Sequence, residues 1–488
     1  MLKEPRPHQH QLEMVTLEEL VPKDHLLRKI DRHIDFAFIH DEVRHLYCED
    51  NGRPAVDPLV LFKMLFIGYL FGIRSERQLV REIQVNVAYR WFLGLSLTDK
   101  VIDASTFSQN RRRRFEGSGI EQLIFDRIVE QAITHGLVGG KALYTDSTHL
   151  KANANKHKWI PQEVEQSPKD YLAELDQAVT EDRQAHGKAP LSPREVVPET
   201  REIKASTTDP QSGYLTREGK PQGFYYLDHR TVDGKHAIIT DSFVTPGNVH
   251  DSLPYLGRLD RQCARFKLKP LIAGLDAGYQ TAAICRGLED RNIHGVIGYR
   301  RPSHRKGTLY KRQFTYDEPT DTYRCPADQV LRYRTTGRQG YRHYASDPQV
   351  CGGCPLRPQC TQSHNHTKVV TRHVWADSVE RTDAHRLTPH GKRYYARRKE
   401  TVERSFADAK QLHGHRYARF RGLSRVQAQC LLAAACQNMK KIALLLARFF
   451  GLPLRFNGPF KALLAFCTTV RARLARPTPI IPVALQLD

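Results

Sequence analysis

Three acidic residues lie where a carboxylate is unusual, and together they could hold divalent metal ions. Asp146 falls inside an alternating segment typical of a β-strand, where an unpaired charge costs several kcal/mol. Asp276 follows the apolar run at residues 271–275, so we expect it at the carboxyl edge of a strand, where α/β sheets bind ligands. Glu403 lies far downstream on a predicted helix. Each acid alone is more often a cap or a surface charge, so only their combination points to chemistry.

Basic residues are spaced around Glu403 as a phosphate-binding surface would require. On a helical wheel of about 100° per residue, Lys399, Glu403 and Lys410 fall within about 40° of one another. Such rows are also common as ion-paired helix surfaces. Glu400 lies about 60° from Glu403 on the same wheel and is the main alternative to it. We expect DNA phosphates to be bound here by Lys410, Lys399, Arg398 and Arg404.

Four cysteines between residues 325 and 360 could form a structural zinc site. Cys351 and Cys354 have the spacing and the tight turn of a zinc knuckle, although a second C-x-x-C pair is lacking. His364 or His366 could replace one thiolate, and unligated cysteines or a redox-labile pair are open alternatives. Four closed ligands would leave no catalytic position on the metal. The candidate ligands are Cys325, Cys351, Cys354 and Cys360.

The pair His250 and Asp251 could also suggest a metal site, as in phosphohydrolases. Those enzymes need further histidines around the pair, and the preceding Asn248 and Val249 supply none. We therefore expect Asp251 to cap a helix that starts at Ser252.

The segments around the acids predict a mixed α/β sheet. Strands are expected at residues 142–150, 224–227, 236–244, 270–276 and 295–298, with a turn at Asp233-Gly234 and a helix after Tyr279. Three meandering strands followed by strand, helix and strand are typical of a mixed sheet. Helical periodicity resumes at Arg393 and runs to about Phe450, with a break near residues 413–423.

The first 125 residues predict a helical DNA-binding domain. Asp57-Pro58 and Ser75 are good helix starts, and a later helix carries a run of four arginines. This pattern fits a helix-turn-helix-like module, and a helical packing domain with a solvated basic face is the alternative. The arginines expected to contact DNA are Arg111, Arg112, Arg113 and Arg114.

The composition favours a polyanionic partner. The 488 residues carry 75 Lys and Arg against 53 Asp and Glu, a net charge of +22, which most often indicates nucleic acid. The most apolar stretch, residues 58–73, is shorter than the ~20 residues that span a bilayer. Ten scattered cysteines do not suggest a disulfide framework. We expect a cytoplasmic, nucleoid-associated protein with no membrane contact.

Four motifs resemble those of bacterial insertion-sequence transposases of the DDE type. They are Tyr144-Thr-Asp146-Ser-Thr, Val244-Thr-Pro-Gly-Asn-Val-His250-Asp251, Gly274-Leu-Asp276-Ala-Gly-Tyr279 and Glu403-Arg404-x-Phe406-x3-Lys410. Residues 74–79 and 103–107 resemble the helical N-terminal domain of the same transposases, and the cysteine segment resembles an insertion found in one branch of them.

The resemblance implies a catalytic domain with the ribonuclease H-like fold and three metal-binding acids at Asp146, Asp276 and Glu403. These would bind two Mg²⁺ ions, with Mn²⁺ as a substitute, and Asp146 would bridge them. The family motif is Tyr-x2-Arg-x3-Glu-x6-Lys; here Lys399 stands in place of the arginine and Ala396 in place of the tyrosine.

The resemblance also implies a transposase that binds the terminal inverted repeats of its element, cleaves DNA and joins the ends to target DNA as a homodimer. A ribonuclease H-like nuclease without strand transfer, or a catalytically inactive DNA-binding regulator, are the alternatives. The expected domains are 1–125 (helical, DNA-binding), 138–302 (catalytic core, first part), 303–390 (cysteine-containing insertion), 391–450 (catalytic core with the glutamate helix) and 451–488 (tail).

Overall fold

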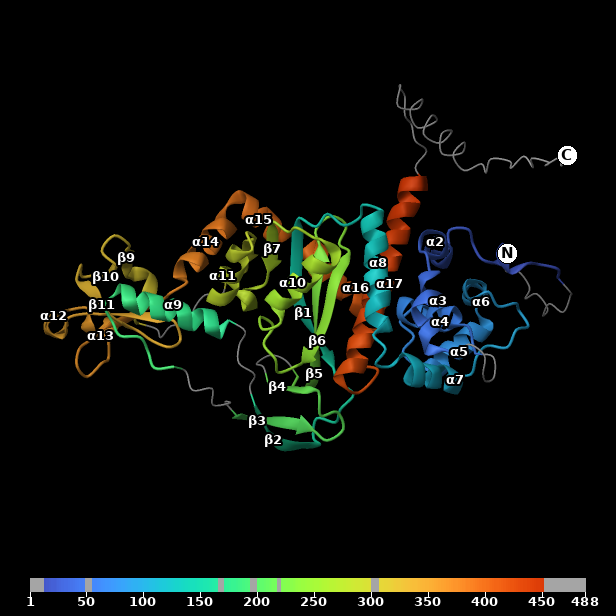
Figure 1. Ribbon diagram of the computed structural model, residues 1–488, viewed down its shortest axis with the longest axis horizontal. Helices are drawn as coiled ribbons and strands as arrows, with labels where there is room; N and C mark the ends of the chain where they lie inside the picture. Colours follow the sequence, from blue (N-terminus) through green and yellow to red (C-terminus); the bar gives the residue numbers. More distant parts are fainter. Residues whose placement is uncertain are drawn as a thin grey trace, which may run out of the picture.

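The computed structural model describes residues 13–48, 55–165, 171–193, 200–216, 221–299 and 307–451. The protein is elongated (Figure 1): a group of N-terminal helices lies at one end, a mixed sheet covered by helices lies in the middle, and a second sheet lies at the other end. The predicted mixed α/β architecture with a helical N-terminal part is confirmed. The predicted tail, 451–488, lies outside the described residues apart from Gly451.

The N-terminal helices share one apolar core with the long C-terminal helix α17 (Leu423–Gly451). Asp57 caps α4 as predicted, accepting a hydrogen bond of 2.8 Å from the Leu59 amide, and α4 is buried nearly all round. The apolar part of α17 is long enough to cross a membrane, but 72% of it is buried inside the protein, as in the core helix of a soluble protein. The helices here are α1 (Leu17–Leu20), α2 (Leu26–His33), α3 (Phe38–Val43), α4 (Pro58–Leu70), α5 (Glu76–Val85), α6 (Val87–Leu93), α7 (Ala104–Asn110) and α8 (Ile120–Thr134).

The central sheet has the strand order β4-β5-β1-β7-β8, and β6 also pairs with β5. Strand β5 is antiparallel to both β1 and β6, whereas β7 and β8 continue the sheet in parallel with β1. The carboxyl ends of β1, β6 and β7 therefore point to the same edge. The strands are β1 (Ala142–Lys151), β4 (Gly213–Leu215), β5 (Gly223–Asp233), β6 (Ile239–Pro246), β7 (Ile272–Leu275) and β8 (His294–Ile297), so the predicted strands are confirmed.

Helices cover both faces of this sheet because the side chains of its strands alternate between two cores. Leu143 and Leu275 pack with α10 (Tyr255–Phe266) and α11 (Ala282–Asp290) on one face. Tyr144 and Ile272 pack on the other face, in the core that contains α17 and the helical segment after residue 388. That segment comprises α15 (Pro389–Ala396), a π-helical turn (Lys399–Glu403) and α16 (Arg404–Leu412).

The second sheet has the order β13-β12-β11-β10-β9 and encloses a small apolar core. Helix α9 (Leu172–Ala185), in the polar segment between β1 and β5, packs against this second sheet. Its Asp182 pairs with Arg342 at 2.6 Å, and its His186 pairs with Asp321 at 2.7 Å. The elements are β9 (Thr315–Asp317), β10 (Thr322–Arg324), β11 (Val330–Thr336), β12 (Tyr341–Ala345), α12 (Pro348–Gly352), α13 (Arg357–Cys360) and β13 (Val369–His373).

The strands before and after α9, β2 (Trp159–Glu165) and β3 (Thr200–Ser206), form a separate two-stranded ribbon. After β13 the chain returns through α14 (Ala376–Leu387), which lies against β8 and α11. The two parts of the molecule are thus joined by the chain at more than one place, and the five domain boundaries given above stay a prediction.

Candidate active site

Asp146 and Asp276 lie next to each other on neighbouring strands, at the level of the sheet where β7 ends. Thr145 is the register partner of Leu275 in the parallel pair β1–β7, so the two aspartates are the next residue on each strand. Asp146 accepts a 2.8 Å hydrogen bond from the Ser147 amide, and Asp276 accepts one from the Gly278 amide at the start of a 3-10 turn. Both side chains are half-buried. The predicted location of Asp276 at the carboxyl edge of a strand is therefore confirmed.

Arg398 links Asp146 to Glu403. Its Nη2 donates a 2.8 Å hydrogen bond to Asp146 Oδ2 and lies 4.0 Å from Glu403 Oε1. Arg398 is buried, whereas the Glu403 side chain is 47% exposed. The structure thus brings Glu403 to the same edge as the two aspartates, with a guanidinium between the carboxylates.

Burial has the largest effect on the electrostatics of Asp146. Burial raises the pKa of Asp146 to about 6; the Arg398 guanidinium and the Ser147 amide lower it, and the charges of Asp276 and Asp251 raise it further. A carboxylate cluster of this kind favours a divalent cation. The oxygen donors suit Mg²⁺, which uses one or two carboxylates and keeps several waters. Among the described residues the acids are adjacent without forming a closed ligand set, because no three of their oxygens lie within 4.8 Å of one another.

A π-helical turn explains why the spacing of the basic residues differs from the prediction. Residues Lys399–Glu403 are π-helical, so a regular wheel of about 100° per residue does not describe this turn. Lys399 is exposed, and Arg398 takes the position beside the acids. Tyr395 stands three residues before Arg398, and its Oη accepts a 3.4 Å hydrogen bond from Arg398 Nη1. The wide turn accommodates one extra residue before Glu403, so Tyr395 and Arg398 have the Tyr-x2-Arg spacing that Ala396 and Lys399 lack.

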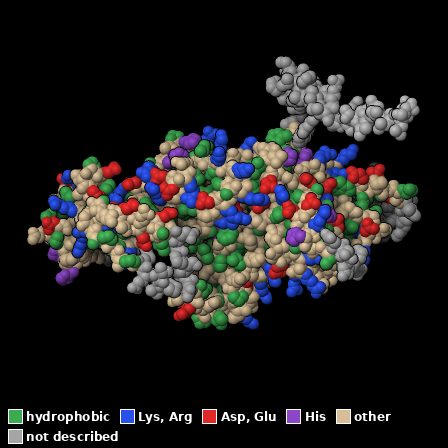
Figure 2. Space-filling view, viewed as in Figure 1, with side chains coloured by type: hydrophobic (Ala, Val, Ile, Leu, Met, Phe, Trp, Pro, Cys, Tyr) green, Lys and Arg blue, Asp and Glu red, His purple; other side chains and the backbone are tan. Residues whose placement is uncertain are grey.

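The other residues predicted to bind DNA fall into two groups. Several already have protein partners: Arg404 pairs with Asp408 at 2.9 Å, Arg111 pairs with Glu76 at 3.0 Å, and Arg114 donates a 2.6 Å hydrogen bond to Asn110. Lys410 is half-buried. Arg112 and Arg113 are exposed and line a surface hollow with Gln109, Glu116 and Arg425. Figure 2 shows Lys and Arg side chains gathered around α7, at the lower edge of the N-terminal helices.

The four cysteines of the zinc prediction line one small hollow beside β11 and α13. Cys325 Sγ accepts a 3.3 Å hydrogen bond from the Gln329 amide, and Cys351 Sγ donates one of 3.2 Å to Ser346. All four thiols are free, and no three of the sulfur atoms lie within 4.8 Å of one another. The thiols are therefore gathered but not closed into a tetrahedron.

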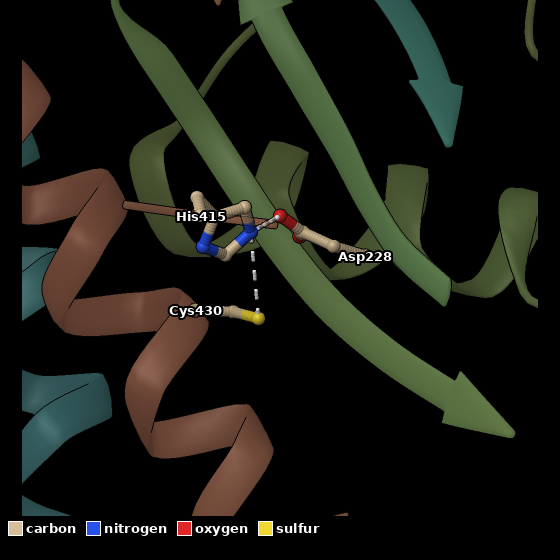
Figure 3. A group of neighbouring side chains, drawn as sticks. All are labelled: Asp228, His415 and Cys430. Carbon is tan, nitrogen blue, oxygen red and sulfur yellow. Dashed lines mark hydrogen bonds and ion pairs between the residues drawn. The ribbon is translucent and has the colours of Figure 1, made fainter. Parts of the chain in front are cut away.

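A buried ion-pair network that was not predicted from the sequence lies next to the acids, and Figure 3 shows part of it. Asp228 of β5 accepts hydrogen bonds from Arg230 Nε at 2.9 Å, His415 Nε2 at 2.8 Å and Ser242 Oγ at 3.0 Å. Cys430 Sγ lies 3.9 Å from His415 Nε2. Burial opposes ionisation of Asp228, but Arg230 and the hydrogen bonds from His415 and Ser242 lower its pKa to about 2.

The group Asp228, His415 and Cys430 has metal-ligand chemistry, and its ligand atoms lie within 4.8 Å of one another. A metal ion does not fit it, because Arg230 already supplies the cation and burial raises the pKa of the Cys430 thiol well above its usual range. The network instead joins the sheet to the helices. Arg230 is the register partner of Asp146, and its Nη1 also donates to Ser405 Oγ at 3.3 Å and Gln437 Oε1 at 3.1 Å. Two residues of opposite charge at alternate positions, directly after the predicted strand 224–227, are the signal that could have revealed it, because β5 continues to Asp233.

The prediction that Asp251 caps a helix starting at Ser252 was wrong. Helix α10 begins at Tyr255, and Pro254 occupies the N-cap position. His250 Nδ1, rather than Asp251, pairs with Ser252 Oγ at 2.7 Å. The charge of Asp251 instead acts on Asp146, which brings it into the neighbourhood of the acidic cluster.

Two family models match separate parts of the chain. A transposase domain (DUF772) matches residues 15–113, and a transposase DDE domain matches residues 324–443, which include Glu403 but not Asp146 or Asp276. Both matches are to transposase domains, which confirms the resemblance of the motifs to DDE transposases and supports a DNA transposase function.

Comparisons with whole proteins add little to this identification. The sequence matches none of the curated proteins. Among solved structures, a cryo-EM structure of a piggyBac transposase synaptic complex with hairpin DNA is 12% identical over 93% of this chain and 82% of that chain, with a TM-score of 0.37. A likeness at that level carries no conclusion about the fold.

Proposed function

We propose that this transposase cleaves the ends of its element and joins them to target DNA with divalent metal ions held by Asp146, Asp276 and Glu403. The observation that carries the proposal is the adjacency of Asp146 and Asp276 at one sheet edge, with Glu403 reached through Arg398. The raised pKa of Asp146 supports it, because burial disfavours the ionised carboxylate and a bound cation would offset that cost.

We also propose that the central sheet has the ribonuclease H-like fold. Its order, with one antiparallel strand between β6 and β1 and two parallel strands beyond β1, supports that proposal, as does the late helical position of Glu403. The catalytic core would then comprise residues 138–302 and 391–450, with residues 1–125 as the DNA-binding part.

A pair of Mg²⁺ ions, or Mn²⁺ in their place, would lower the pKa of the attacking water or 3′-hydroxyl and stabilise the leaving oxygen. Asp146, at the centre of the cluster, would contact both ions, and Asp276 and Glu403 would each complete the shell of one. Arg398 would hold Asp146 in place before the ions bind. Lys410 would bind a phosphate of the terminal DNA, because it lies on α16, the helix that begins directly after Glu403.

The partners of this reaction are the terminal inverted repeats of the element and the target DNA, and the active form would be a homodimer that brings two ends together. The net charge of +22 and the exposed Arg112 and Arg113 support DNA binding. A cytoplasmic, nucleoid-associated location follows from these partners.

The proposal is tested with duplexes that carry the ends of the element. Asp146→Asn, Asp276→Asn and Glu403→Gln are each expected to reduce metal-dependent cleavage by about 10³-fold, because a catalytic ion stabilises the transition state by several kcal/mol. DNA binding in a mobility-shift assay should survive. Glu400→Gln is the matched control and should cleave normally.

Equal loss of binding and cleavage would indicate a structural role for the acids, and a loss confined to Glu400→Gln would identify the wrong glutamate. Pre-cut ends separate the two remaining enzyme classes, since a transposase joins them to target DNA and a plain nuclease does not. Absence of metal-dependent cleavage would leave a DNA-binding regulator.

We further propose that Cys325, Cys351, Cys354 and Cys360 bind a structural Zn²⁺ ion. The common hollow and the amide-to-sulfur bond at Cys325 support the proposal, because zinc knuckles have such bonds and the surrounding core is small. Metal analysis of the purified protein should give one zinc per chain, falling to zero in Cys351→Ser but not in Cys263→Ser. A zinc-free protein of unchanged thermal stability would contradict it.

A further inference from the structure

The turn after β6 carries an acid to the same edge of the sheet as the three proposed metal ligands. Strand β6 runs in the direction of β1 and β7, and it ends at Pro246, five residues before Asp251. Just beyond Asp251, the ring of Tyr255 packs on the ring of Tyr279 with centroids 5.4 Å apart. Tyr279 lies in the turn that follows Asp276, so the two turns are adjacent.

Asp251 is half-buried, and among the described residues it makes no hydrogen bond or ion pair. After burial, its charge is the largest influence on the pKa of Tyr279 and on the pKa of His229, and it raises both. An unpaired carboxylate beside two others is costly unless a cation is present.

Two buried polar atoms near Asp251 also lack partners. Tyr279 is fully buried, and its hydroxyl has no hydrogen-bond partner while it feels the charges of Asp251, Asp146 and Asp276. His229 is 5% exposed; its Nε2 is bonded to Thr245 Oγ1 at 2.8 Å, but its Nδ1 has no partner. Buried polar atoms are rarely left unsatisfied, so these two face a group that is bound or reoriented during function.

We propose that Asp251 is a fourth acidic residue of the catalytic centre and contributes to holding the divalent ions. Tyr279 Oη and His229 Nδ1, which have no hydrogen-bond partner here, would become positioning groups for its carboxylate when the ions bind. Two divalent ions carry a charge of +4 and Arg398 adds one more, against −3 from Asp146, Asp276 and Glu403, so a fourth carboxylate lowers the excess from +2 to +1. This inference rests on the proposed metal-dependent function and adds a residue to it.

The test measures Mn²⁺ binding to the full-length protein without DNA, by titration calorimetry and by the electron paramagnetic resonance signal of free Mn²⁺. Asp251→Asn is expected to weaken binding by about tenfold, the scale on which loss of a group that supports a metal site is felt. Tyr279→Phe should weaken it less. The matched control is Asp260→Asn on α10, whose exposed carboxylate pairs with Arg291 at 2.6 Å and should leave Mn²⁺ affinity unchanged.

Unchanged affinity in a folded Asp251→Asn protein would overturn the inference, as would an equal loss in Asp260→Asn. Asp251→Ser serves the same purpose if the asparagine variant does not fold. Asp146→Asn separates this inference from the proposed function: if Asp146→Asn weakens Mn²⁺ binding and Asp251→Asn does not, only the fourth acid is wrong. If Asp146→Asn binds Mn²⁺ normally, the proposed metal site itself is wrong.

Discussion

Asp146 and Asp228 lie on neighbouring, directly paired strands of one sheet, and the protein treats them in opposite ways. Asp228 is fully buried between Arg230, His415 and Ser242, and its pKa falls to about 2. Asp146 has one guanidinium and two nearby acids, and its pKa rises to about 6. The charge of Asp228 is neutralised inside the protein, so Asp228 serves the structure, whereas Asp146, whose pKa is raised mainly by burial, is the aspartate that we propose to bind an external cation. Arg230, opposite Asp146, connects the two environments.

Removing the cation from the buried network should have the largest effect on stability. Arg230→Met leaves the buried Asp228 with His415 and Ser242 but without its guanidinium, so we expect the free energy of unfolding in urea to fall by about 3–5 kcal/mol. Arg286→Met breaks the exposed pair with Asp290 and should cost less than about 1 kcal/mol. Similar losses in the two variants would mean that the network contributes no more than a surface pair.

Removing the charge from Asp146 should raise the free energy of unfolding, and the increase should depend on pH. The folded-state pKa of about 6 exceeds the ordinary value of 3.8, so the metal-free protein loses stability as pH rises from about 4 through 6. Asp146→Asn should therefore be more stable than the parent protein at pH 8 by up to about 3 kcal/mol, two pKa units at about 1.4 kcal/mol each. The difference should vanish below pH 4.

Asp228→Asn provides the contrast in the same unfolding series. Its lowered pKa contributes stability that is present above pH 4 and is lost as pH falls toward 2, so the variant should be less stable than the parent at pH 8. A stabilised Asp228→Asn, or a destabilised Asp146→Asn at pH 8, would remove the distinction between the two aspartates.

The smallest expected effect is on Mn²⁺ affinity, and it follows from replacing Arg398, the cation beside Asp146. Arg398→Gln removes a competitor for the carboxylate, so Mn²⁺ affinity at pH 8 should rise by about tenfold, equivalent to one charged hydrogen bond of roughly 1.5 kcal/mol. The pKa of Asp146 should also rise, since Arg398 lowers it. Arg404→Gln, which only breaks the exposed pair with Asp408, is the control and should bind Mn²⁺ as before.

Much of the central sheet was predictable because its strands alternate regularly and its turns contain glycine. The edge position of Asp276 followed from an apolar run that ends at that residue. The same signal, a charge inside a strand, was used for Asp146 and overlooked for Asp228 and Arg230. Periodicity alone does not say whether a buried charge has a partner, since the partner here comes from residues about 190 positions later, at His415.

A helical wheel could not predict that Arg398, rather than Lys399, lies beside the acids. A π-helical turn depends on contacts with the sheet rather than on local periodicity, and it shifts every position before Glu403 by one residue. The environment of Asp251 was missed for a similar reason, because a cap was the most economical local explanation. The predictions of zinc binding and of the DNA-contacting lysines and arginines stay open to the experiments above.

The docking of α9 on the second sheet has a practical consequence for dissecting this protein. Helix α9 follows β1 in the sequence, whereas the strands of the second sheet follow β8. The second sheet and α9 are therefore not one contiguous segment of the chain. Excising residues 303–390 would strip the cover from Leu175 and Val179 and would strand the buried Asp182 without Arg342. A shortened transposase would have to lack both α9 and residues 303–390. If it kept α9 alone, the apolar face of that helix would be exposed to solvent and would favour aggregation.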